Sequence, residues 1–164
     1  MEAEILNKTR KRLFAYLCIV LALSMNLTFS IVDFIEGDRL EMLIDILICL
    51  ILIAGFIGIN KFNADILVYR SVLFLLSAGL LYSISIGSGN GTVVYWLFPF
   101  PIVFIFFLGK KEGLIFSLVF LIILSLLLFN PFPFEIYVYD NEVSTRFLAA
   151  LLFLTVIFYG LEAS

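Results

Sequence analysis

The segment LFAYLCIVLALSMNLTFSIVDFI, residues 13–35, decides the class of this fold. It contains one charged side chain, Asp33, and that residue lies close to its end. A helix of this length, rising 1.5 Å per residue, would reach ~34 Å, which is enough to cross the ~30 Å hydrocarbon core of a bilayer with some tilt. We therefore predict a transmembrane helix here.

Five further apolar runs follow, separated by polar breaks. All but the last of these breaks are so short that they can join only neighbouring antiparallel helices. The sequence therefore predicts an all-α integral membrane protein, a six-transmembrane-helix bundle in which residues 1–164 form a single transmembrane domain. The predicted spans are residues 13–35, 42–59, 66–86, 93–108, 114–129 and 147–161.

The composition of the whole chain agrees with a lipid environment. Of its 164 residues, 63% are hydrophobic and 14% are charged, and the mean hydropathy is +1.18. A soluble domain has ~45–50% apolar and ~25% charged residues, so this chain has too little polar surface to cover a globule in water. The lipid bilayer is therefore its first expected partner.

The residue counts exclude several kinds of functional site. Histidine, the commonest general base and metal ligand, is absent, and the two cysteines cannot form a cysteine-rich metal site. The basic residues are scattered and the net charge is −3, so we expect no nucleic-acid partner. Phosphate-binding loops and paired acid–base residues are also missing from the sequence. We expect no catalytic residues, no metal, no cofactor and no enzymatic activity in these residues.

The basic residues are unevenly divided between the two ends of the predicted spans. Eight of the ten lie before the first span, around the break between the second and third, or between the fourth and fifth. Arg39 and Arg146 lie at the opposite ends. Loops rich in Lys and Arg remain in the cytoplasm. We therefore predict a multi-pass protein with both termini cytoplasmic.

Three charged residues lie at the predicted outer ends of the spans. Asp33 closes the first span, Asp45 lies one turn into the second, and Arg146 opens the sixth. Charges are costly in lipid and are often functional, so these residues form a candidate ion cluster that would bind a polar ligand or lock the helices together. The alternative is that each side chain separately extends to the lipid headgroups.

The fourth span combines prolines with aromatic residues and reads YWLFPFP over residues 95–101. Proline removes a backbone donor and clashes with the preceding turn, so we predict a kink or a break. A ligand-binding cavity is predicted between this kink and the outer halves of the first and third spans, with a second aromatic tract, NPFPFEIYVY at 130–139, as a lid. The alternative is that the polar residues form interhelical hydrogen bonds and the rings form an interfacial belt. The predicted lining residues are Asn26, Ser30, Trp96, Phe98 and Phe100.

Two stretches, YWLFPFPIVFIFFLGKKEG (95–113) and RFLAALLFLTVIFYGLEAS (146–164), resemble one known family. They are similar to the multi-span N-terminal sensor regions, of the MASE or 7TM type, of bacterial diguanylate cyclases and some histidine kinases. In those proteins the last span continues into a cytoplasmic signalling helix and a catalytic domain. The resemblance implies a sensor of the bacterial inner membrane, and it places any output domain beyond Ser164.

We interpret the chain as a membrane-embedded sensory domain. It would act as a homodimer, bind a small apolar or amphipathic signal near the outer face, and pass a helix shift through residues 147–162 to a cytoplasmic output domain. The rival interpretation is a small membrane carrier or channel, which would need a continuous polar path across the bilayer. A scaffold subunit of a membrane complex is a third alternative.

Overall fold

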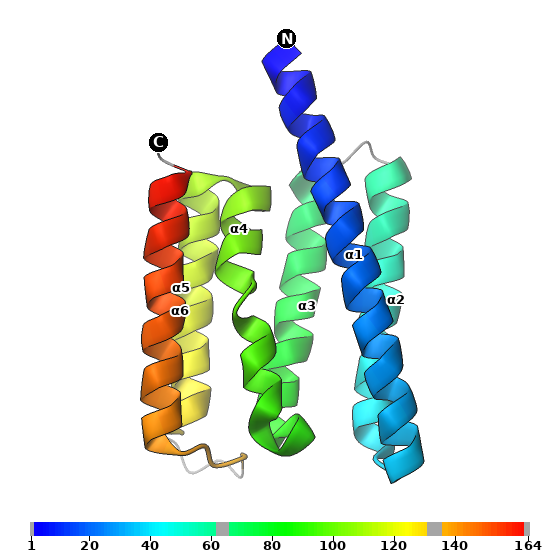
Figure 1. Ribbon diagram of the computed structural model, residues 1–164, viewed down its shortest axis with the longest axis vertical. Helices are drawn as coiled ribbons and strands as arrows, with labels where there is room; N and C mark the ends of the chain where they lie inside the picture. Colours follow the sequence, from blue (N-terminus) through cyan, green and yellow to red (C-terminus); the bar gives the residue numbers. More distant parts are fainter. Residues whose placement is uncertain (1, 62–65, 131–135, 163–164) are drawn as a thin grey trace. The chain divides into compact units, whose positions relative to one another are not determined.

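A computed structural model describes residues 2–61, 66–130 and 136–162. Every regular element in these residues is helical, which confirms the all-α prediction (Figure 1). The elements are α1 (Glu2–Glu36), α2 (Arg39–Lys61), α3 (Ile66–Ile86), the 3-10 helix η1 (Ser88–Leu97), α4 (Phe100–Leu108), α5 (Lys110–Phe129) and α6 (Asn141–Leu161).

Five of these helices, α1, α2, α3, α5 and α6, are long and apolar enough to cross a membrane. The bent pair of η1 and α4 would make a sixth span if it crosses as one unit. Large apolar side chains remain exposed along the helices, for example Leu13 at 71% and Phe153 at 66%. Such a surface suits lipid and not water. The count of six spans and the cytoplasmic placement of the termini stay predictions.

The break in the predicted fourth span is confirmed. The helix axis bends by 44° between η1 and α4. Pro99 immediately precedes α4, and Pro101 occupies its first turn, where the missing N–H has no helical partner to lose. The two prolines therefore end one short helix and begin another.

Most of the helices begin before the apolar runs that predicted them, and α5 and α6 show this clearly. α5 begins at Lys110 and α6 at Asn141, one turn or more ahead of the predicted starts at residues 114 and 147. Hydropathy marks only the part of a helix that contacts lipid, whereas polar residues can continue the same helix into water. The extra turn brings α5 to 20 residues, about 30 Å, which is enough to cross a bilayer.

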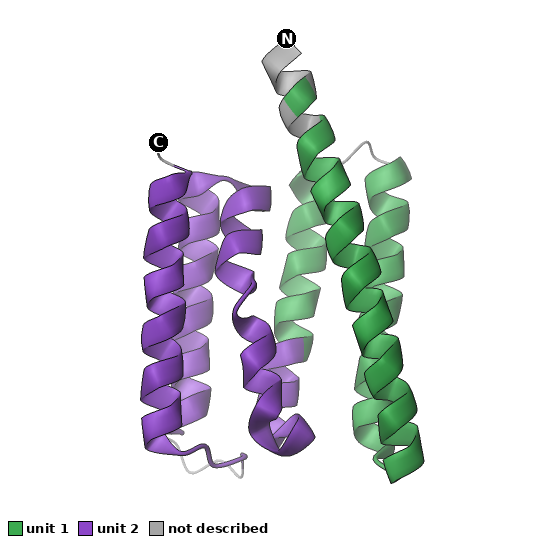
Figure 2. Ribbon diagram, viewed as in Figure 1, with its two compact units in different colours: residues 1–79 green, residues 80–164 purple. Residues whose placement is uncertain are grey.

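The chain divides into two compact units, residues 1–79 and 80–164 (Figure 2). We call them unit 1 and unit 2. Unit 1 contains α1, α2 and most of α3, and unit 2 contains the end of α3 with η1, α4, α5 and α6.

In unit 1, α1 packs along α2, and α2 approaches α3 at two glycines. A Cβ atom on Gly55 would lie 2.8 Å from Val72 Cγ2, and one on Gly58 would lie 3.0 Å from Val68 Cγ1. Lipid tails provide no hydrophobic force between helices, so close packing at small residues has to hold them together. The two glycines therefore set the contact between α2 and α3.

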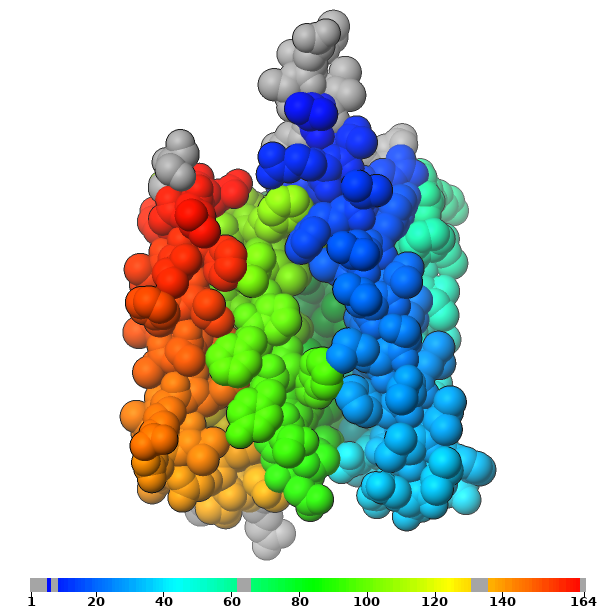
Figure 3. Space-filling model, in the orientation of Figure 1, coloured from blue at the N-terminus to red at the C-terminus, as the bar shows by residue number. Residues whose placement is uncertain are grey.

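In unit 2, the helices α4, α5 and α6 pack against one another in pairs. The ring of Phe100 stacks on Phe120 with centroids 5.4 Å apart, and Phe104 meets Phe120 edge-on at 5.7 Å. The space-filling view shows the side chains of η1 and α4, in green, directly beside those of α6, in orange and red (Figure 3). An aromatic core therefore joins α4 to α5.

Gly109 alone separates α4 from α5, and residues 110–113 of the sequence GKKEG form the first turn of α5. Gly109 has φ 83° and ψ 167°, a conformation that is essentially restricted to glycine. Gly113 lies against α4, where an added Cβ would come within 2.4 Å of Ile105 Cα. Both glycines are required by the backbone, one for the turn and the other for the close approach of two helices.

Candidate functional site

The loop that opens η1 has an unusual backbone. Gly87, Gly89, Asn90 and Gly91 all have positive φ angles, between 54° and 84°, and the N–H of Gly91 donates to Gly87 O at 2.9 Å. Left-handed conformations cost little for glycine and are tolerated by asparagine, which accounts for the sequence GSGNGT at 87–92. The result is a tight coil with almost no side-chain bulk.

Residues 136–140, which we call the tyrosine strap, lie on this coil. The N–H of Tyr137 donates to Ser85 O at 2.9 Å, and its hydroxyl donates to Asn90 O at 3.1 Å. The hydroxyl of Tyr139 donates to Ile84 O at 2.9 Å. Three hydrogen bonds therefore join the strap to the end of α3 and the start of η1.

The glycines make room for the ring of Tyr137. A Cβ atom on Gly87 would lie 2.0 Å from Tyr137 Cδ2, and one on Gly91 would lie 2.9 Å from Tyr137 Cε1. The rings of Tyr137 and Tyr139 meet at a centroid distance of 4.8 Å and an angle of 68°. The strap can occupy this position only because both coil residues lack a side chain.

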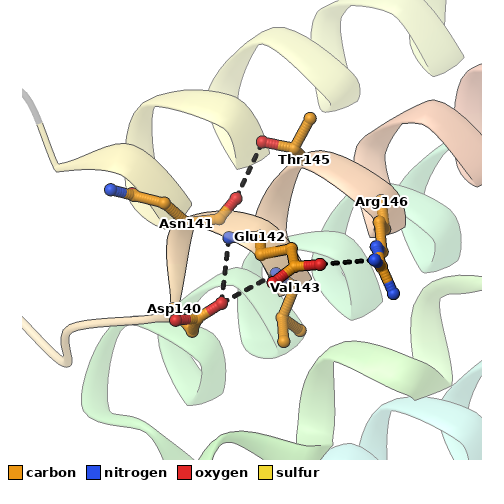
Figure 4. A network of polar contacts seen from close by, with 6 residues as sticks. All are labelled: Asp140, Asn141, Glu142, Val143, Thr145 and Arg146. Atoms are coloured by element: carbon orange, nitrogen blue, oxygen red, sulfur yellow. Dashed lines mark hydrogen bonds and ion pairs between the residues drawn. The ribbon is translucent and has the colours of Figure 1, made fainter.

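The strap continues directly into α6. Asp140 caps the helix, because its Oδ1 accepts hydrogen bonds from the N–H groups of Glu142 at 2.9 Å and Val143 at 3.0 Å (Figure 4). One turn further, the Arg146 guanidinium pairs with the Glu142 carboxylate. An N-terminal cap of this kind stabilises a helix by about 1 kcal/mol.

A pocket of about 180 Å³ lies between the coil and the strap. We call it the tyrosine pocket. All of its lining residues come from unit 2, and none of them is basic. They are Asn90, Gly91, Thr92, Val94, Tyr95, Tyr137, Val138, Tyr139, Asp140 and Val143.

Burial raises the pKa of Tyr139 to about 12, and the neighbouring Tyr137 adds to the shift. The unfolded phenol ionises near 10. The strap's contribution to stability is therefore complete below pH about 10 and is lost as the pH rises through about 12. We expect absorbance titration of the phenolates to show a late step near pH 12 that disappears in Tyr139→Phe. If all tyrosines of the unaltered chain ionised near pH 10, with no later step, the burial of the Tyr139 hydroxyl would be contradicted.

A larger apolar groove, of about 520 Å³, lies between α2 and α3 in unit 1. Among the described residues that line it, Ser71 alone has a polar side chain, so they offer almost nothing to orient a ligand. In a bilayer, acyl chains would fill such a space. Its other lining residues are Leu50, Ile51, Ala54, Gly55, Leu67, Val68, Val72 and Leu75.

A polar network joins α1 to α2 in unit 1. Arg12 donates through Nε to Tyr16 Oη at 2.6 Å and through Nη2 to Asn60 Oδ1 at 2.8 Å. The Tyr16 hydroxyl donates to the same Asn60 oxygen at 2.7 Å, and the Tyr16 ring lies 5.2 Å from that of Phe56. These polar groups bond to one another across the two helices, so the network serves packing.

Comparison with known protein families identifies the chain. MASE6, a family of membrane-associated sensor domains, matches residues 6–164. The chain belongs to the MASE6 family. The resemblance to a MASE-type sensor region is thereby confirmed. No curated protein and no solved structure matches the chain.

Membership of MASE6 makes the chain a membrane sensor domain and a multi-pass membrane protein. The family's domain is itself non-catalytic. Within the described residues, the structure contains no group of three or more acidic or cysteine side chains able to hold a metal ion.

The five predicted cavity residues fall in both units. Asn26 and Ser30 lie on α1 in unit 1, where the Asn26 amide donates to Ala22 O of its own helix at 2.8 Å. Trp96 is the last residue but one of η1 in unit 2, and its side chain is exposed. The cavity between these residues stays a prediction.

The two predicted phenylalanines of that cavity contribute to packing in unit 2. Phe98 meets the ring of Phe147 of α6 at 4.9 Å, and Phe100 stacks on Phe120 of α5. Aromatic pairs at such distances add to the stability of helix contacts. Both side chains therefore join α6 or α5 to the segment around the kink.

The predicted ion cluster is also divided between the units. Asp33 of α1 and Asp45 of α2 lie close enough within unit 1 to interact electrostatically. Arg146 lies in unit 2 and is paired with Glu142. The structure thus brings two of the three residues together, and a cluster of all three stays a prediction.

The residues of the strap were not among the predicted site residues. The tract 130–139 was predicted to form a lid, and residues 131–135 of it lie outside the described residues. Tyr137 and Tyr139 are two apart, so in an extended segment they project to the same side. That spacing, together with the glycine-rich loop at 87–91, was the only feature of the sequence that could have indicated the strap.

Proposed function

We propose that this MASE6 chain is the signal-receiving domain of a bacterial inner-membrane sensory protein. It would hold a small apolar or amphipathic signal near the outer face and pass a helix shift through α6 to a cytoplasmic output domain, such as a diguanylate cyclase. Both termini would lie in the cytoplasm, as the distribution of Lys and Arg predicts. A homodimer would convert the helix shift into altered spacing of the attached domains.

The observation that carries this proposal is the continuity of the strap with α6. The tyrosine strap is hydrogen-bonded to the segment 84–90 and ends at Asp140, which caps α6. Seven of the ten lining residues of the tyrosine pocket belong to the coil or the strap, so a ligand in the pocket would contact these segments. Any displacement of the strap would therefore act on the first turn of α6.

The helix α6 is suited to carry such a displacement. It extends without a break for 21 residues, about 30 Å, from Asn141 to Leu161. It has no proline, and its single glycine, Gly160, is next to its last residue. A shift at one end would thus be transmitted along a stiff rod, and shifts of about 1–2 Å are sufficient for signalling between helices.

A fusion of residues 1–164 to a cyclase domain that requires dimerisation tests this function. We expect Tyr137→Ala, which removes the ring from the strap, to change the cyclase output several-fold at equal membrane levels. Tyr82→Ala is the matched control, because Tyr82 is a 50% exposed side chain outside the pocket. The fusion also reports orientation, because the cyclase can reach its nucleotide substrate only in the cytoplasm.

Two further arms sharpen the result. A flexible Gly-Ser linker between α6 and the cyclase should abolish the difference between Tyr137→Ala and the unaltered chain, because it breaks the rigid connection. Asp45→Ala and Arg146→Ala test the predicted ion cluster, and Asn26→Ala with Ser30→Ala tests the predicted cavity. Output that is the same in Tyr137→Ala, Tyr82→Ala and the unaltered fusion would refute signalling through the strap.

A further inference from the structure

We propose that the tyrosine pocket binds a small organic cation, a methylated ammonium group carried either by a free solute or by a lipid headgroup. The inference rests on the proposed function, because it names the chemical class of the signal held at the same site. It follows from four properties of the pocket: its hydrogen-bonding groups, its aromatic rings, its charge and its size.

The hydroxyl groups of the pocket can only accept hydrogen bonds from a ligand. The hydroxyl hydrogens of Tyr137, Tyr139 and Thr92 are all donated to backbone carbonyl oxygens of the segment 84–90. Each hydroxyl oxygen therefore presents only lone pairs to an occupant. Since no lining residue is Lys or Arg, the pocket favours an occupant that brings positive charge.

Three tyrosine rings line the same small space. The rings of Tyr137 and Tyr139 are in edge-to-face contact, and Tyr95 meets Phe147 of α6 at 6.3 Å. Tyr95 is 53% exposed and Tyr137 is 37% exposed, so an incoming ligand can reach both rings. The face of an aromatic ring attracts a cation within about 6 Å of its centroid, and aromatic cages are a recurrent means of binding quaternary ammonium groups.

Asp140 supplies the negative charge. Its Oδ1 accepts both capping hydrogen bonds, and no residue in the described part of the chain bonds its Oδ2 (Figure 4). The N-terminus of α6 carries the equivalent of about half a positive charge, which the full charge of Asp140 exceeds. The neighbouring Glu142 is paired with Arg146, so these two residues add no net charge. The balance of charge at the pocket is negative.

The size of the pocket limits the ligand. A cavity of about 150 Å³ can hold a benzene molecule, whereas sites for drug-sized ligands measure about 300–1,000 Å³. The tyrosine pocket, at about 180 Å³, therefore has room for about six or seven non-hydrogen atoms. Tetramethylammonium and choline are of this size, and their methyl groups suit the valine side chains of the wall.

The test is a choline titration of the full chain in nanodiscs of phosphatidylglycerol, followed by the fluorescence of Trp96, the single tryptophan of the chain. The control ligand is 3,3-dimethyl-1-butanol, which has the shape of choline without its charge. We expect saturable binding of choline and of tetramethylammonium, with choline binding roughly tenfold more tightly than the neutral alcohol. Inorganic phosphate should not compete.

Two variants connect the binding to the pocket. Asp140→Asn keeps the helix cap, because asparagine caps as well as aspartate, but it removes the charge. Tyr95→Leu removes one ring outside the strap, and Tyr82→Leu is its control. We expect the first two variants to weaken choline binding by about threefold to tenfold and Tyr82→Leu to leave it unchanged.

The lipid arm identifies the source of the cation. If adding phosphatidylcholine to the nanodiscs weakens the binding of free choline, the ligand is a lipid headgroup, and if it does not, the ligand is a solute. Absence of saturable binding, equal binding of choline and the neutral alcohol, or displacement by phosphate would each overturn the proposal. A fusion that responds to Tyr137→Ala while choline fails to bind would leave the sensory function intact and reject only the ligand class.

Discussion

Replacing Gly113 by alanine is expected to separate α4 from α5. The new Cβ would lie 2.4 Å from Ile105 Cα, 2.5 Å from Phe104 O and 2.7 Å from Ile105 N. All three are backbone atoms, so no side-chain rotation relieves the overlap and the helices must move apart. Overpacking of this kind costs about 1–3 kcal/mol, and the higher helix propensity of alanine returns about 1 kcal/mol. Because the overlap involves backbone, we expect a net loss of about 2 kcal/mol.

The measurement is thermal unfolding of the purified protein in detergent, followed by the loss of the monodisperse peak in gel filtration. A loss of this size should lower the midpoint by about 4–8 °C for a chain of this length. Gly160→Ala is the matched control, because an added Cβ there meets no atom within 4 Å. Equal midpoints for Gly113→Ala and Gly160→Ala would mean that α4 and α5 are not in contact at the first turn of α5.

Gly87→Ala is expected to release the tyrosine strap. Gly87 has φ +74°, which costs alanine about 1–2 kcal/mol, and the new Cβ would overlap Tyr137 at 2.0–2.8 Å. Tyr137 is fixed by its backbone N–H as well as its hydroxyl, so relief of the overlap breaks both hydrogen bonds. The ionisation of Tyr139 should then move from near pH 12 towards its ordinary value near 10, and choline binding should disappear.

Gly37→Ala separates backbone strain from loss of the strap. Gly37 has φ +90°, a comparable penalty for alanine, but its added Cβ meets no atom within 4 Å. We expect this variant to be destabilised by about 1–2 kcal/mol and to keep the late tyrosine step. If the two variants lost the late step to the same degree, or if neither lost it, the proposed packing of the Tyr137 ring against Gly87 would be contradicted.

The helices could be predicted from the sequence because a spanning helix must present apolar side chains to lipid over ~20 residues. The ends could not be predicted as well. Asp140 caps α6 and Lys110 is the first residue of α5. Both are polar, as loop residues usually are, so their hydropathy does not show that a helix begins there. The predicted starts at 114 and 147 therefore mark the beginning of each apolar run and not the beginning of each helix.

Polar residues within the spans were poor guides to a cavity. Ser24, Asn26 and Thr28 each donate to a carbonyl oxygen three or four residues back in α1. Ser77 and Thr155 do the same in α3 and α6. A short polar side chain in a membrane helix can satisfy itself in this way, so its presence does not imply an interhelical partner or a ligand.

The tyrosine pocket depends on contacts between residues that are far apart in the chain. The hydroxyl of Tyr137 bonds to Asn90, 47 residues away, and that of Tyr139 bonds to Ile84, 55 residues away. A single sequence contains no information on which loops meet. It showed only that one loop is rich in glycine and that another carries two tyrosines with a spacing of two, and the pairing of these loops required the structure.

The length of α1 has a practical consequence for imaging a protein of this size. Its 35 residues make a continuous helix of about 52 Å, whereas the hydrocarbon layer is about 30 Å thick. The apolar part of this helix begins only at Leu13, after the basic residues Arg10, Lys11 and Arg12. A helical fusion partner joined in phase at the N-terminus would extend this helix without a hinge. The fused partner would then hold a fixed orientation and would serve as a fiducial marker for particle alignment in electron cryomicroscopy.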